Sequence, residues 1–143
     1  MDIAWTAGIV EGEGCIRLNK CDVKDSRSGK LIKGRVSLQV TVAMKDAAVI
    51  DRLYELWGGY RATNKIGMHI WTLGSNSALR FLLAIQKFVI GAKRAQLELG
   101  IEFQASKRIG RRSPGRIAYE NAAVVSMSAM KKIGVYDGPQ SSL

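Results

Sequence analysis

Two glutamates, Glu11 and Glu13, stand near the start of the 143-residue chain, and each is followed by a glycine. They end an apolar stretch in a chain whose formal net charge is +10. Paired carboxylates could bind a divalent cation, because Mg²⁺ prefers oxygen ligands and commonly combines one or two carboxylates with phosphate oxygens. A glycine-rich helix end with exposed acids is the simpler interpretation of the same residues. The surrounding elements must decide between the two.

The glutamates close a helix that the sequence predicts over residues 2–12. Asp2 is placed to cap its start, and the glycines at 12 and 14 are placed to end it. Ala4, Gly8 and Gly12 recur every four residues and share one face. A glycine inside a helix costs about 1 kcal/mol relative to alanine. Close approach of another backbone is the usual reason for such a glycine.

After this helix the hydrophobic period changes to two. Alternation around residues 16–19 and 35–42 predicts two half-buried strands, joined by a polar loop over residues 22–34. A helix over 45–59, a hairpin over 60–74 and helices over 75–91, 92–107 and 117–134 follow. We therefore predict an α+β fold with an αββαββα core, an antiparallel four-stranded sheet with helices on one face, and extra C-terminal helices. Residues 1–106 form the core, and 107–143 form a basic linker and helical extension of the same domain.

The charge balance favours an anionic partner. Lys and Arg number 22 against 12 Asp and Glu, and the sequence pI is near 10. Nucleic acid is the first candidate, with an anionic membrane surface or plain solubility as alternatives. The predicted free sheet face is polar throughout, and a two-stranded ribbon of this kind fits the major groove; an ordinary solvated face is the other interpretation. On that face we expect Arg17, Asn19, Arg35, Ser37, Gln39 and Thr41.

Several other classes of protein lack support. No apolar run approaches the roughly 20 residues of a membrane span, and the first residues do not resemble a signal peptide, so we expect an intracellular protein, cytoplasmic or organellar. Cys15, Cys21 and the single His69 cannot complete a zinc site, and both thiols are expected to be free. No phosphate-binding glycine loop or hydrolase triad is present. We expect no small-molecule cofactor.

The stretch "TAGIVEGEG" at residues 6–14 resembles the motif that names the LAGLIDADG homing endonucleases, with the two glutamates in its acidic positions. The resemblance continues along residues 3–105. "MKDAAVIDRLYELWGG" resembles the second helix of that family, "IWTLGS" its fourth strand and "IGAKRAQLELGIEF" its late helix. The motif is moderately specific alone and strongly specific in this order of elements.

The resemblance implies a saddle-shaped DNA-binding sheet and a Mg²⁺-dependent DNA endonuclease that makes a staggered double-strand break. Ca²⁺ is expected to bind without supporting cleavage. Glu13 would be the catalytic metal ligand, with the Gly12 carbonyl as a further ligand and Glu11 as a supporting acid. Lys93 would lie near the scissile phosphate, and Gln96 would help to place solvent.

The resemblance also implies a homodimer on a long pseudo-palindromic target, because the motif occurs once and protein symmetry imposes DNA symmetry. Ala4, Gly8 and Gly12 would form the dimer interface. Beyond the six free-face residues, the expected DNA contacts are Lys20, Arg27, Lys33, Arg61, Asn64, Lys65, Arg111 and Arg112. An intron RNA-splicing maturase or a non-cleaving DNA-binding protein on the same scaffold remains an alternative.

Overall fold

The computed structural model describes residues 2–108 and 112–135. The expected α+β class and the αββαββα order are confirmed, with two further helices after the core. The elements are α1 (Asp2–Glu13), β1 (Gly14–Lys24), β2 (Leu31–Met44), α2 (Ala47–Trp57), β3 (Tyr60–Thr63), β4 (His69–Gly74), α3 (Ser75–Ile85), the short 3-10 helix η1 (Gln86–Phe88), α4 (Lys93–Ala105) and α5 (Pro114–Val135).

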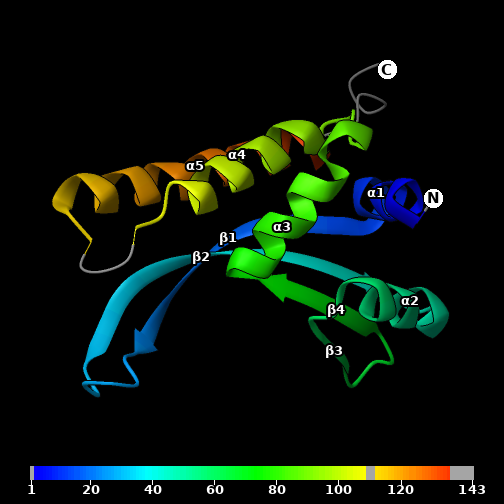
Figure 1. Ribbon diagram of the computed structural model, residues 1–143, viewed down its shortest axis with the longest axis horizontal. Helices are drawn as coiled ribbons and strands as arrows, with labels where there is room; N and C mark the ends of the chain where they lie inside the picture. The colour runs from blue at the N-terminus through cyan, green and yellow to red at the C-terminus, as the bar shows by residue number, and fades with distance from the viewer. Residues whose placement is uncertain (1, 109–111, 136–143) are drawn as a thin grey trace.

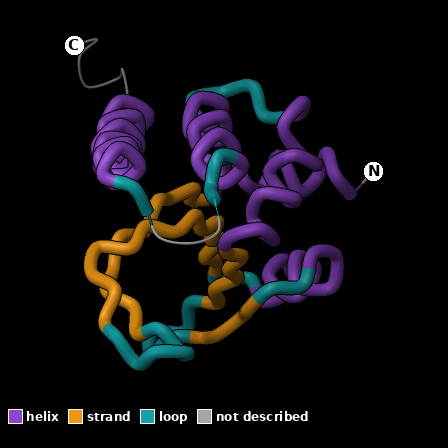
Figure 2. The backbone as a smooth tube through the Cα atoms, turned by 60° about the vertical axis from the view of Figure 1, so that its left-hand side comes forward, coloured by secondary structure: helices purple, strands orange, loops and turns teal. Residues whose placement is uncertain are grey.

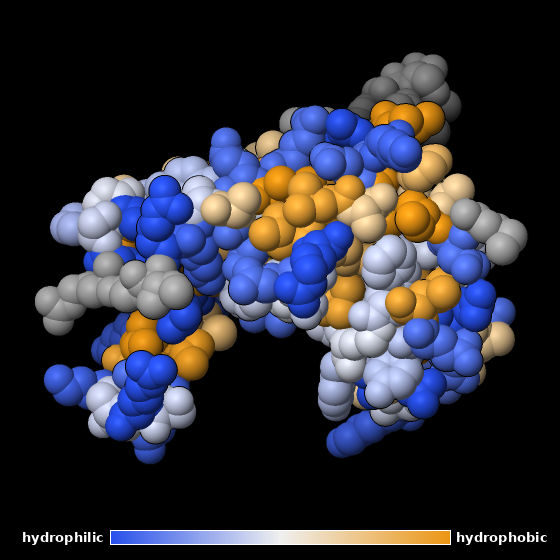
Figure 3. Space-filling model, in the orientation of Figure 1, coloured by the Kyte–Doolittle hydropathy of each residue, from blue (hydrophilic) through white to orange (hydrophobic). Residues whose placement is uncertain are grey.

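The four strands form one antiparallel sheet in the order β1-β2-β4-β3. The helices lie together on one side of this sheet, and its other side is open (Figures 1 and 2). In Figure 1 the β1–β2 ribbon descends on the left and the β3–β4 hairpin on the right. The space-filling view shows the molecule hollowed between these two projections (Figure 3). The sheet therefore presents a concave face that no helix of the described residues covers (Figures 1 and 3).

Alternation along the strands explains which face is covered. Ile16, Val40, Val42 and Trp71 are fully buried beneath the helices. The Trp71 ring meets the ring of Phe81 on α3 with centroids 5.2 Å apart. Because successive strand side chains point to opposite faces, the residues between these positions point to the open side. One apolar core thus fixes the direction of every polar side chain on the free face.

The predicted loop over residues 22–34 is wrong in most of its length. β1 continues to Lys24 and β2 begins at Leu31, so both strands run far beyond the core as a two-stranded ribbon. The Asp22 side chain accepts a hydrogen bond of 2.8 Å from the Gly34 backbone N–H, where the register of the two strands shifts. Both faces of this outer ribbon are largely exposed, so no hydrophobic alternation marks it in the sequence.

The predicted helix over residues 75–91 is also shorter than expected. α3 ends at Ile85, η1 continues it through Phe88, and Val89 is extended and fully buried. Burial of Val89 takes the chain away from the helix axis. The following backbone, at Ile90 and Gly91, passes beside the end of α1.

The C-terminal helix α5 packs against α4 and against β1. Ala123 and Met127 are its buried apolar contacts with the core. None of the helices in the described ranges is long and apolar enough to cross a membrane.

Candidate DNA-binding and cleavage site

Glu13 is the last residue of α1 and is exposed where the helix turns directly into β1. Gly14 makes this abrupt turn possible, because a β-carbon there would lie 2.7 Å from the carbonyl oxygen of Val10. The last turn of α1 carries no basic residue. A helix C-terminus presents unpaired carbonyls and the negative end of the helix dipole. A carboxylate in that position favours a bound cation.

Glu11 is turned away from Glu13, toward the segment before α4. Its carboxylate accepts hydrogen bonds from the backbone N–H groups of Ile90 at 3.0 Å and Gly91 at 3.2 Å. A β-carbon at Gly91 would lie only 2.9 Å from Glu11 Oε2, so the glycine permits this approach. Glu11 therefore attaches the end of α1 to the start of α4.

Lys93 reaches the end of α1 from α4, and Gln96 lies one turn further along the same helix. Lys93 begins this helix, and its Nζ donates to the backbone carbonyl of Glu11 at 3.4 Å. Gln96, one turn later, is only 4% exposed, and within the described residues its Oε1 has no hydrogen-bond partner. An unpaired buried acceptor costs about 1–3 kcal/mol. An ordered water molecule would satisfy this oxygen.

Within this chain the donor atoms at this helix end fit Mg²⁺ only incompletely. Among the described residues no group of three or more His, Cys, Asp or Glu side chains could enclose a metal ion. The available ligands are the Glu13 carboxylate and a backbone carbonyl of the last α1 turn such as that of Gly12, since the Glu11 carbonyl accepts from Lys93. Mg²⁺ usually keeps several waters and takes further oxygens from phosphates. The residues therefore fit a cation shared with a phosphodiester.

Removing Glu11 is expected to destabilise the fold. In Glu11→Ala the two N–H groups lose their acceptor, and we expect the free energy of unfolding to fall by about 1–3 kcal/mol, as measured by urea denaturation. Glu98→Ala is the matched control, since Glu98 is an exposed acid that pairs with Arg94 along α4. This control should change stability by less than about 0.5 kcal/mol. Equal stability of the two variants would contradict an anchoring role for Glu11.

The register of β1 and β2 places most of the expected free-face residues together. Arg17 lies opposite Gln39, and Asn19 lies opposite Ser37. Each of these four is at least partly exposed, whereas the alternate residues of both strands in this part of the sheet are buried. Thr41, Arg35 and Lys33 continue the same face along β2, and Arg27 is exposed in the ribbon's terminal turn.

Two expected DNA contacts lie on the other side of the sheet. Lys20 pairs with the buried Val36, and its Nζ donates to Asn121 on α5 at 2.9 Å. Arg61 pairs with the buried Trp71, and its guanidinium binds Asp51 on α2 at 2.7 Å. Their positive charge predicts contact with DNA, but strand alternation directs both side chains toward the helices instead.

The remaining expected contacts differ in how free their side chains are. The Asn64 Oδ1 accepts from the backbone N–H groups of Ile66 and Met68 and so shapes the β3–β4 turn, beside the exposed Lys65. Arg112 is largely buried and donates to Glu120 on α5 at 2.7 Å. The prediction for Arg111 falls outside the described residues.

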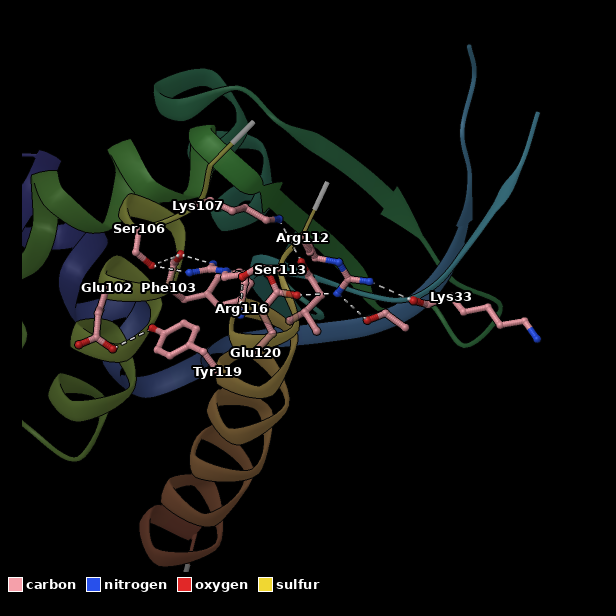
Figure 4. A network of polar contacts seen from close by, with 12 residues as sticks. Lys33, Glu102, Phe103, Ser106, Lys107, Arg112, Ser113, Arg116, Tyr119 and Glu120 are labelled. Carbon is pink, nitrogen blue, oxygen red and sulfur yellow. Dashed lines mark hydrogen bonds and ion pairs between the residues drawn. The ribbon is translucent and has the colours of Figure 1, made fainter. Parts of the chain in front are cut away.

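A network of arginines around Glu120 connects α5 to the sheet. Glu120 is 1% exposed and accepts from Arg112 and Arg116, which come from either side of it in Figure 4. The other Arg112 nitrogen donates to the backbone carbonyl of Lys33 on β2, whose side chain extends away from the network. Glu120 could not be predicted readily from the sequence, because its partners Arg112 and Arg116 belong to a segment whose composition indicates a basic loop. The i, i+4 spacing of Arg116 and Glu120 was the available signal.

A second missed contact involves Cys15 at the start of β1. Lys131 on α5 approaches its sulfur at 3.2 Å, and Arg17 lies nearby. Burial raises the pKa of the Cys15 thiol, but these two cations outweigh it and hold the pKa below its ordinary value. A separation of 116 residues leaves no local pattern that could predict the pair.

The small-residue stripe of α1 is exposed on this chain. Ala4, Gly8 and Gly12 are exposed, and a β-carbon built at either glycine has no neighbouring atom within 4 Å. The glycines are therefore not required by packing within the protomer. Trp5, beside the stripe, is 37% exposed.

The chain has the fold of the LAGLIDADG homing endonucleases, with the same order of elements and an acidic helix end above an open sheet. The homing endonuclease I-CvuI, in complex with the I-CreI target, has a TM-score of 0.75 and 20% identity over 90% of this chain and 81% of its own. The homing endonuclease I-TnaI has a TM-score of 0.68 and 14% identity over 92% of this chain and 95% of its own. A double mutant of I-SmaMI has a TM-score of 0.69 and 16% identity over 88% of this chain but only 44% of its own. No protein-family model and no curated protein matches the chain.

Proposed function

We propose that this protein is a site-specific, metal-dependent DNA endonuclease that makes a staggered double-strand break in a long pseudo-palindromic target. The observation that carries the proposal is the position of Glu13. This exposed carboxylate ends a helix beside Lys93, and the strand that follows it immediately joins an open cationic sheet. The homing endonuclease fold of the solved relatives supports the same activity.

At the cleavage centre, Glu13 and the Gly12 carbonyl would hold Mg²⁺ together with phosphate oxygens. The cation would supply Lewis-acid polarisation of the phosphodiester and a more acidic water. Lys93, whose Nζ reaches the helix end, would stabilise negative charge on the scissile phosphate. The unpaired Gln96 Oε1 would accept a hydrogen bond from an ordered water. Solved complexes of I-CvuI on DNA include one with Mg²⁺, in which the DNA is not cleaved, and one with Ca²⁺.

The sheet would read the target through the major groove. The Arg17 and Gln39 side chains lie opposite each other on the free face, and such groups form bidentate contacts with guanine and adenine. Arg27, Lys33 and Lys65 are exposed cations at the projecting turns and strand, where contact with phosphates would set the register. Lys20 and Arg61 are not part of this proposed surface.

A homodimer would provide two cleavage centres. The exposed stripe on α1 permits close packing of two helices, since small residues let backbones approach. The chain spans nearly all of I-TnaI but less than half of I-SmaMI. A two-fold dimer would place the two Glu13 carboxylates on either side of the symmetry axis, and the target would share that symmetry.

A plasmid library with a randomised insert tests the proposed activity directly. With excess Mg²⁺ we expect linearised plasmids that share one pseudo-palindromic site, and with Ca²⁺ we expect bound but intact DNA. If about six phosphates are neutralised, log affinity should fall with log salt with a slope near −5. Specific binding that never leads to cleavage with Mg²⁺ would contradict the endonuclease. Salt-sensitive binding without a selected site would contradict site-specific recognition.

A further inference from the structure

The strand residues on the part of the free face nearest Glu13 are uncharged, although Lys131 of α5 and Arg17 approach the Cys15 thiol at its edge. Gly14, which follows Glu13, pairs with Val42, so the rows on either side of Val42 lie level with the cleavage centre. In one row Cys15 on β1 lies opposite Thr41, Thr41 lies opposite Thr72, and Thr72 lies opposite Tyr60 on β3. Beyond the Cys15 thiol at its edge, this row presents two methyl-bearing hydroxyl side chains and an aromatic ring.

The second row is wholly aliphatic. Ala43 lies opposite Ile70, and Ile70 lies opposite Ala62. All three are partly exposed, whereas their strand neighbours Val42 and Trp71 are fully buried on the helix side. Alternation therefore directs these aliphatic side chains to the open face.

The free face is thus divided in two. Farther along β1 and β2 the paired residues are Arg17 with Gln39 and Asn19 with Ser37, whose side chains all carry hydrogen-bonding groups. The aliphatic row belongs to the same concave surface as these polar residues and to a chain of net charge +10. Charge complementarity therefore favours DNA over an apolar protein partner as the occupant of both halves.

The chemistry of base edges determines what an aliphatic row can recognise. The thymine C5-methyl is the one apolar group on a base edge in the major groove, and Ala, Thr methyl and larger apolar side chains contact it. An aliphatic side chain pressed against guanine or against an unmethylated cytosine would leave polar atoms without partners, which is unfavourable.

We propose that the two rows beside the cleavage centre recognise C5-methyl groups of pyrimidines, chiefly thymine, in the base pairs next to the cut. Ile70 is the central specificity residue, and the outer rows read purines by hydrogen bonding. This inference rests on the proposed function, because it assigns base preferences to the same DNA-binding sheet.

Replacement of thymine by deoxyuridine tests the inference, because it removes only the methyl group. Binding of the full-length protein to the selected site is measured in Ca²⁺, with one thymine replaced at a time. At one or more positions near the cut we expect about fourfold weaker binding per methyl, as burial of one such group implies. Replacement at outer positions should leave the affinity unchanged. Where cytosine can replace thymine, 5-methylcytosine should restore most of the affinity that cytosine loses.

Two variants connect the effect to the sheet. In Ile70→Ala the fourfold difference between thymine and deoxyuridine should disappear at one position and persist at the others. Gln39→Ala is the control from the polar half; it should weaken binding overall while leaving every methyl effect intact. The folding control is the site in which every thymine is replaced by deoxyuridine. Ile70→Ala should bind this site as tightly as the wild-type protein does, which shows that the variant is folded.

The outcomes separate this inference from the function on which it rests. Site-specific binding with no deoxyuridine effect near the cut overturns methyl recognition and leaves the endonuclease proposal standing. A methyl effect that Ile70→Ala does not alter overturns the assignment to this row. A failure to select any DNA site overturns both.

Discussion

Glu13→Gln is expected to abolish DNA cleavage while leaving DNA binding intact. The substitution keeps the shape of the side chain and removes the only negative charge proposed to hold Mg²⁺ on this protomer. Metal activation of the phosphodiester contributes several kcal/mol, so we expect the single-turnover cleavage rate to fall by about 10³-fold or more. Because Glu13 is exposed, the fold should be unaffected. Affinity for the same target in Ca²⁺ is measured in parallel.

Glu55→Gln is the matched control for loss of one negative charge. Glu55 is an exposed acid on α2, far along the chain from the proposed centre, and it pairs only loosely with Arg52 at 3.7 Å. Its cleavage rate should remain within about twofold of wild type, because exposed ion pairs contribute little. Cleavage by Glu13→Gln at the rate of this control would remove Glu13 from the centre and, with it, the observation on which the proposed function rests.

The parts of the fold that could be predicted from the sequence are those with one buried face. Ile16 and Leu18 on β1, and Val36 to Val42 at alternate positions on β2, mark strands because the core selects apolar residues there. The same alternation gave the free face, whose Arg17–Gln39 and Asn19–Ser37 pairs follow directly from the register. A one-residue shift would have reversed every assignment.

The ribbon beyond the core could not be predicted in this way. Residues 22–24 and 31–34 are paired strands, yet solvent reaches both of their faces and no hydrophobic pattern remains. Apart from the Arg112 contacts with the Lys33 and Gly34 carbonyls, they are held by backbone pairing and by the hydrogen bond from Gly34 to Asp22. These interactions depend on the conformation of the turn, which the residue types allow but do not require.

Contacts between segments far apart in the chain could not be predicted from the sequence either. The hydrogen bonds of Glu11 join residues about 80 positions apart, and those of Lys20 and Cys15 reach α5 across still longer separations. Charge alone placed Lys20 and Arg61 on the DNA side, whereas each is directed to a helix by its position in the strand. For residues on a sheet, the strand position decides the face and the charge does not.

Gly8→Leu is expected to break self-association while leaving the protomer folded. A β-carbon at Gly8 has open space around it in the protomer, so nothing within one chain opposes the larger side chain. Between two α1 helices the added volume would cost about 1–3 kcal/mol for each copy, which implies dimerisation weaker by about 30-fold or more. Sedimentation of the free protein measures the association. Cleavage should lose its double-strand character, because an isolated protomer carries one centre.

Two further substitutions distinguish a helix that contacts the other protomer from a helix that merely has room for larger side chains. Gly8→Ala should raise the helix stability of the protomer by up to about 1 kcal/mol and yet weaken the dimer, since the small stripe is useful only if another backbone lies against it. Ala122→Leu places a leucine side chain on an exposed position of α5 and should change neither property. If Gly8→Leu sediments like Ala122→Leu, then the exposed stripe is not the contact between protomers. The pairing of cleavage centres would then have to use another surface.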